Sequence, residues 1–171
     1  MELWDLYDEN RRLLDRTHRR GEQMKTGEFH VVVEVWTINA EGEILVTLRD
    51  PNKRDYPNKW ENTGGSVLSG ESSRRGAVRE LHEETGIVAS ENELIFLGTS
   101  KDRSAFVDIY FLKRDVKIED IILQDGETVD AKFISLDTLE SMIKDLSLAL
   151  PPRKRLQHVR NEFDKHYCAK L

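Results

Sequence analysis

Residues 60–87 read WENTGGSVLSGESSRRGAVRELHEETGI, and the rest of the chain is best interpreted outward from this stretch. Two glycines open it, a loop of small residues follows, and three glutamates then fall within five residues. Ser72 is a favourable N-cap and Gly86 is a favourable C-terminal stop. The sequence therefore predicts an α-helix over residues 73–85.

The predicted helix has an apolar face beside an acidic face. At about 100° per residue, the residues expected to share the core-facing arc are Ala77, Val78, Leu81 and Thr85. The neighbouring arc carries the three glutamates Glu80, Glu83 and Glu84. Like charges three or four residues apart repel by roughly 0.2–0.5 kcal/mol per pair, so a bound cation is expected among them. Hard oxygen ligands suit Mg²⁺ or Mn²⁺.

The spacing of the charged and glycine residues is more specific than the helix itself. The defined positions are Gly65, Glu71, Arg79, Glu80, Leu81, Glu83, Glu84, Gly86 and Ile87. This series resembles the Nudix box, G-x5-E-x7-R-E-U-x-E-E-x-G-U with U apolar, at every defined position. Because so many positions agree at fixed spacing, a solvated acidic helix face is a poor explanation of the glutamates.

The resemblance implies a chemistry and a set of site residues. Nudix hydrolases cleave a nucleoside diphosphate linked to another group, X, by metal-assisted attack of water on phosphorus. The implied cofactor is Mg²⁺ or Mn²⁺, and the partner is a small-molecule diphosphate. The metal ligands that it implies are the Gly64 carbonyl, Glu71, Glu80, Glu83 and Glu84. Among these, Glu80 is either a ligand or the general base, and Arg79 is expected to orient the box glutamates.

Family members often use one more carboxylate from a loop before a later strand, and Glu127 stands at that place. Asp125 is the alternative. The basic residues around the loop of residues 50–59 are candidate phosphate contacts, namely Arg49, Lys53, Arg54 and Lys59. Tyr56 and Trp60 are candidates for stacking on a base, whereas Trp36 lies in a β-rich run and is expected in the core.

Strand-like segments surround the box. Those predicted as strands are residues 29–38, 44–49, 59–65, 92–101, 104–116 and 131–136. Further helices are expected over residues 137–146, with Asp137 as N-cap, and over residues 153–165. Residues 2–18 are expected to form a leading β-hairpin. We expect an α+β fold, an α/β/α sandwich around a mixed sheet, as one domain over residues 1–171. In this division, residues 1–28 are a hairpin and loop extension, and residues 29–171 are the core with its C-terminal helix.

Composition excludes several classes of protein. The net charge is −6 over 171 residues, so no global basic field draws the chain to nucleic acid. No apolar segment is long enough to span a bilayer, so no membrane association is expected. The single cysteine, Cys168, rules out an internal disulfide framework and fits a reducing cytoplasm.

Two alternatives to hydrolysis remain at this stage. Residues 29–62 resemble the strand–turn–strand segment of isopentenyl diphosphate isomerase, including His30 near a strand start. That enzyme needs a cysteine where this chain has Gly64, Gly65 and Ser66, so a structural histidine is the better interpretation of His30. A Nudix module that senses a nucleotide without cleaving it is the second alternative. The hairpin, which resembles that of isomerase-like Nudix hydrolases, either shapes the substrate pocket or forms a homodimer contact.

Overall fold

Strand β3 (His30–Ile38) is the centre of the fold in the computed structural model, which describes residues 2–168. Eight of its nine residues are buried, as expected of a run rich in β-branched side chains. It pairs in parallel with β8 (Ala105–Lys113) and antiparallel with β6 (Thr63–Ser66). Its last residue, Ile38, also pairs with the start of β4 (Ile44–Arg49).

The remaining strands extend this sheet on both sides. Three further strands belong to it, namely β5 (Trp60–Glu61), β7 (Ile95–Lys101) and β9 (Thr128–Ile134). The strand order is β5-β4-β3-β8-β7, with β6 paired to β3 and β9 paired to β4. Parallel and antiparallel pairs occur together, so the sheet is mixed as predicted.

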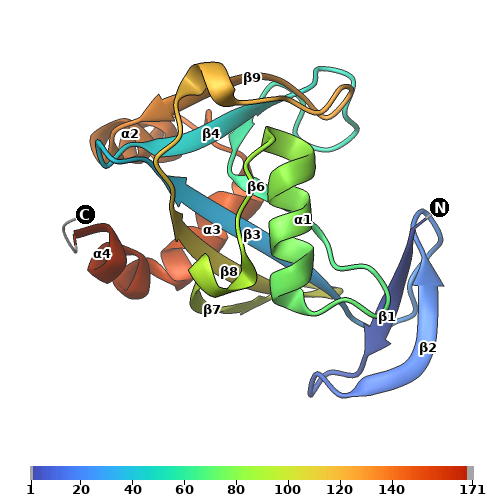
Figure 1. Ribbon diagram of the computed structural model, residues 1–171. Coiled ribbons are helices and arrows are strands. Elements are labelled where there is room, and N and C mark those ends of the chain that lie inside the picture. The colour runs from blue at the N-terminus through green and yellow to red at the C-terminus, as the bar shows by residue number, and fades with distance from the viewer. Residues whose placement is uncertain (1, 169–171) are drawn as a thin grey trace.

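Helices cover both faces of the sheet (Figure 1). On one face, Val33 and Val35 of β3 share a core with Leu81 of α1 (Ser73–Thr85). On the other face, Trp36 is fully buried and makes an edge-to-face contact with Phe163, with ring centroids 5.8 Å apart. The helices that contribute to the core on that side are α2 (Leu136–Lys144), α3 (Leu150–His158) and α4 (Arg160–Cys168). This layering confirms the predicted α+β fold.

The predicted hairpin consists of β1 (Leu3–Tyr7) and β2 (Leu13–Arg19) and lies beside the start of β3 (Figure 1). Tyr7 and Phe29 exchange two backbone hydrogen bonds, at 2.7 and 2.9 Å. The Arg11 guanidinium donates to the Asp108 carboxylate of β8 at 2.7 Å. The hairpin is therefore bound to the core at both of these places.

Some predicted boundaries were wrong. Helix α2 (Leu136–Lys144) begins one residue before the predicted start at residue 137. Its N-cap is Ser135 rather than Asp137, and the Ser135 hydroxyl accepts a hydrogen bond from the Thr138 amide at 3.2 Å. Strand β7 begins late because residues 91–93 form a short 3₁₀ helix. Strand β9 begins early, at Thr128, because its pairing with β4 extends that far.

The C-terminal helix predicted over residues 153–165 is two helices. The first begins at Leu150, with Pro151 and Pro152 in its first turn, where a missing N–H leaves no bond unmade. The helices meet at Val159, and the second continues to Cys168. Of the helices within residues 2–168, none has the length and apolar character needed to cross a membrane.

Candidate active site

Strand β6 and helix α1 bring the glycine pair against the box glutamates. The backbone N–H of Gly64 donates to a carboxylate oxygen of Glu84 at 3.2 Å. A Cβ atom on Gly65 would lie 2.1 Å from the Glu80 carboxyl carbon, closer than atoms can approach. The two glycines are therefore required by close approach, because any side chain at Gly65 would occupy the place of the Glu80 carboxylate.

Arg79 gathers three of the glutamates. Its guanidinium donates to Glu71 at 3.0 Å, to Glu80 at 2.9 Å and to Glu83 at 3.0 Å. It also donates to the Ser66 carbonyl at 2.9 Å, which joins the helix to the end of β6. A planar fork with five N–H donors can satisfy such a set, which a lysine ammonium cannot.

Glu84 is the box glutamate that Arg79 does not reach. Burial raises the pKa of its carboxyl well above the ordinary value, and the nearby carboxylates of Glu61 and Glu80 raise it further. The hydrogen bond from Gly64 acts in the opposite direction and is the weaker influence. A carboxylate surrounded by other carboxylates in this way is electrostatically poised for a cation.

We use the name box cavity for the hollow of about 120 Å³ beside these residues. Its lining residues are Glu2, Arg20, Gly64, Gly65, Ser66, Glu80, Glu83, Glu84, Gln124 and Glu127. The structure thus brings Glu127, from the loop before β9, to the same hollow as three box glutamates. Glu71 is not among the lining residues, because its carboxylate is held by Arg79 and by the Leu68 amide at 3.0 Å.

Five glutamates line the box cavity, and carboxylate oxygens are ligands that Mg²⁺ and Mn²⁺ prefer. Within residues 2–168, no three His, Cys, Asp or Glu side chains are already gathered into a metal-binding cluster. The reason is visible in the contacts of Arg79, which holds Glu80 and Glu83 by ion pairs. The residues present fit a divalent cation by chemical type and by their excess negative charge.

The predicted phosphate contacts are mostly engaged with acids. Arg49 donates to Glu61 at 2.6 Å, Lys53 forms an ion pair with Glu127, and Arg54 pairs with Asp55 at 2.8 Å. All three line a second hollow next to the box cavity, described below. Lys59 instead donates to the Leu146 carbonyl at 2.9 Å and lines neither hollow. Its predicted role therefore has no geometric support.

Glu61 is a site residue that the sequence reasoning missed. Burial raises the pKa of its carboxyl to about 7, despite the ion pair with Arg49. Its charge also raises the pKa of Glu84, so it belongs to the electrostatics of the same site. The sequence feature that could have identified Glu61 is its position three residues before Gly64, on a predicted strand that leads into the glycine pair.

The comparisons with known proteins agree with this geometry. Residues 28–158 match the family model described as NUDIX domain. An uncharacterised Nudix hydrolase of Listeria monocytogenes is 38% identical over 143 residues, covering 83% of this chain and 85% of the relative. A Deinococcus radiodurans protein of known crystal structure superposes with a TM-score of 0.75 at 22% identity, covering 94% of this chain and 98% of that one. The chain therefore belongs to the Nudix family and is a hydrolase of that family.

The isomerase resemblance is narrower. An isopentenyl-diphosphate Δ-isomerase of Escherichia coli is 33% identical over 71 residues, covering 41% of this chain and 39% of the isomerase. In the structure, Gly64, Gly65 and Ser66 form β6 beside the box glutamates, where that enzyme type needs its cysteine. Cys168 lies at the end of α4 and is exposed. The match covers less than half of either chain and does not show the isomerase reaction for this protein.

Proposed function

We propose that this protein hydrolyses the diphosphate linkage of a nucleoside diphosphate-X or a related compound, with Mg²⁺ or Mn²⁺ as cofactor. The observation that carries the proposal is the position of Glu84. Its carboxylate is held against Gly64 at one edge of the box cavity and has Glu61, Glu80 and Glu127 as its charged neighbours. Without a cation, the close approach of these carboxylates is electrostatically unfavourable. A bound cation, which the family's chemistry requires, would balance their charge.

Glu83 and Glu84 are the residues best placed to hold the cation, with the Gly64 carbonyl and Glu80 beside them. When bound, a divalent cation neutralises the diphosphate and lowers the pKa of a coordinated water. Glu80 and Glu127 face the same hollow, so each is a candidate to accept the proton of the attacking water. Arg79 acts as a positioning residue, because it holds Glu80 and Glu83 in place.

The test is a panel of diphosphates incubated with the protein and Mg²⁺, with products identified by mass. The panel contains nucleoside triphosphates, nucleotide sugars, dinucleoside polyphosphates, coenzymes and non-nucleotide diphosphates. We expect at least one compound to gain the elements of water on cleavage, and Glu84→Gln to lose at least about 100-fold in turnover. The matched control is Glu41→Gln, an exposed glutamate in the β3–β4 turn.

Three results would reject the proposal. The first is no turnover of any compound, which favours a sensing module. The second is a product of unchanged mass, which indicates isomerisation. The third is equal activity of Glu84→Gln and the wild type. A homodimer and a cytoplasmic location stay predictions, to be checked by scattering in solution and by cell fractionation.

A further inference from the structure

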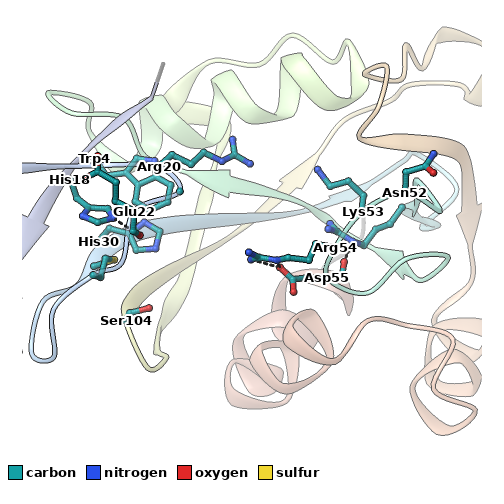
Figure 2. Close-up of a pocket in the computed structure, with 13 residues that line it drawn as sticks. Trp4, His18, Arg20, Glu22, His30, Asn52, Lys53, Arg54, Asp55 and Ser104 are labelled. Atoms are coloured by element: carbon teal, nitrogen blue, oxygen red, sulfur yellow. Dashed lines mark hydrogen bonds and ion pairs between the residues drawn. The ribbon is translucent and has the colours of Figure 1, made fainter.

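A second and larger hollow lies between the N-terminal hairpin and the loop that joins β4 to β5. We name it the hairpin cavity, and its volume is about 760 Å³. Figure 2 shows two facing walls with open space between them. One wall consists of Trp4, His18 and His30, and the other comes from the loop residues Lys53 and Arg54. The family match begins at residue 28, so Trp4 and His18 of this hollow lie outside it, whereas His30 lies inside it.

The first wall is aromatic and contains nitrogen atoms without partners. The rings of Trp4 and His30 are stacked, with centroids 4.2 Å apart and planes at 15°. His30 is only 8% exposed, and its Nδ1 atom has no hydrogen-bond partner within residues 2–168. The Trp4 Nε1 atom is likewise buried without a partner in the described chain. Unsatisfied buried nitrogens are uncommon in folded proteins and call for an explanation, and these two belong to residues that line the hairpin cavity.

His30, one of the two histidines of this wall, has a neutral ring. Burial, with a smaller contribution from the neighbouring His18, lowers the pKa of His30 to about 4. At neutral pH, His30 therefore presents an uncharged imidazole. An uncharged ring can stack on another planar ring without adding positive charge to the wall.

The opposite wall is cationic. The Arg54 side chain is 91% exposed and is tethered only by its ion pair with the adjacent Asp55. In Figure 2 its guanidinium points from the loop across the open space toward His30. A planar guanidinium facing an aromatic wall can close the second side of a sandwich around a flat ring.

The hairpin cavity and the box cavity share one lining residue and are joined by one ion pair. Arg20 lines both hollows, and Lys53 lines the hairpin cavity while pairing with Glu127 of the box cavity. The hairpin is also fixed to the box itself. The Asp5 carboxylate accepts from the Ser69 hydroxyl at 2.6 Å and from the Gly70 amide at 2.9 Å. Arg20 and Lys53 are therefore the basic residues that connect the two hollows.

We propose that the hairpin cavity is the subsite for a planar nitrogen heterocycle carried on the substrate's diphosphate. The ring lies between His30 and Arg54, with Trp4 supporting His30 from behind, and Arg20 and Lys53 contact the phosphates. The substrate class is then a nucleoside diphosphate derivative rather than a sugar or prenyl diphosphate. The position of the diphosphate rests on the proposed function. The contact with the ring can be tested by binding, without any hydrolysis.

The test measures binding through tryptophan emission, with Mg²⁺ present. The ligands are ADP, GDP, CDP and UDP, and inorganic pyrophosphate is the comparator without a ring. Trp4 is the tryptophan of the hairpin cavity, whereas Trp36 is fully buried and Trp60 lies under the Lys132 ammonium, 3.9 Å from its ring centroid. We expect at least one nucleoside diphosphate to quench emission, and Trp4→Phe to abolish the quench.

Arg54→Ala is the decisive variant, because an exposed side chain can be removed without unfolding the protein. We expect its Kd for the quenching nucleotide to rise about fivefold, whereas its Kd for pyrophosphate, measured by calorimetry, should stay unchanged within about twofold. His30→Leu should weaken nucleotide binding further, by about tenfold. The matched control is Arg12→Ala, an exposed arginine of the N-terminal hairpin that does not line the cavity.

The results separate the two proposals. If no nucleoside diphosphate quenches emission, or if Arg54→Ala and Arg12→Ala bind equally well, the ring subsite is wrong even where hydrolysis is observed. If the nucleotide quenches through Trp4 but no diphosphate is cleaved, the ring subsite stands and the hydrolytic function fails.

Discussion

The Glu84 carboxylate accepts a hydrogen bond from the backbone amide of Gly64, at 3.2 Å, which joins the last turn of α1 to strand β6. The carboxylate is thereby held in a place where burial and its acidic neighbours oppose its charge. In the proposed function this local loss of stability is the cost of a site for a cation, a common relation between function and stability. The first two predictions follow from this contact.

Binding of Mg²⁺ should raise the melting temperature of the wild type, because the cation relieves repulsion around Glu84. A ligand present at about 100 times its Kd stabilises the folded state by about 2.7 kcal/mol. Glu84→Gln should be more stable than the wild type in EDTA and should gain little from Mg²⁺. Differential scanning fluorimetry with and without the metal measures both effects. Equal Mg²⁺-induced shifts in the two proteins would contradict this prediction.

The contribution of Glu61 and Glu84 to the stability of the metal-free protein should decrease as the pH rises from about 5 to about 8. His30, whose pKa is lowered to about 4, acts in the opposite direction up to its ordinary pKa of 6.5. The pKa of Glu61 is raised from 4.5 to about 7, and that of Glu84 is raised well above its ordinary value. Both carboxyls bind a proton more tightly in the folded state than in the unfolded chain. Their contribution is therefore fully present below the unfolded pKa and is lost as the pH passes the folded pKa.

Chemical denaturation in EDTA at several pH values measures this loss. Glu84→Gln should show a smaller decrease over the same range, and the control Glu41→Gln should follow the wild type. A decrease of the same size in Glu84→Gln would show that another group is responsible.

Arg79→Lys should weaken both the fold and the site. A lysine ammonium cannot reach Glu71, Glu80 and Glu83 together, so at least one carboxylate loses its partner. We expect the free energy of unfolding to fall by about 1–3 kcal/mol and turnover to fall at least about tenfold. Urea denaturation and product release measure these changes. Arg75→Lys, at an exposed position of the same helix, is the control and should leave both unchanged.

The two glycines should respond differently to alanine. At Gly65 the added Cβ meets the end of the Glu80 side chain, at 2.1 Å, and that side chain can rotate away. Gly65→Ala should therefore lower turnover by about tenfold or more while the protein stays folded. At Gly64 the added Cβ meets the Val33 backbone carbonyl at 2.7 Å, which the strand pairing holds in place. Gly64→Ala should thus lower the melting temperature more than Gly65→Ala does. The reverse order would show that this backbone is more tolerant than its geometry indicates.

Several parts of the fold follow from short-range patterns. Helix α1 begins and ends as predicted, with Ser72 accepting from the Arg75 amide at 3.1 Å and Gly86 in the left-handed region at φ 73°. The burial of Trp36 was also predicted correctly from its β-rich neighbours. The break of the C-terminal helix at Val159 was not predicted, because nothing in the local sequence at that residue is a helix stop.

The identity of the box glutamates and their place on one helix could be read from the chain alone, because helix geometry ties residues three and four apart to one another. The ion-pair partners of the site residues could not be predicted from helix geometry. Lys53 and Glu127 are 74 residues apart in sequence, yet they form an ion pair beside the box cavity. Likewise, the stacking of Trp4 on His30 requires the hairpin to lie beside β3. Such contacts depend on distances through space, and only the packing of strands, helices and loops against one another sets those distances.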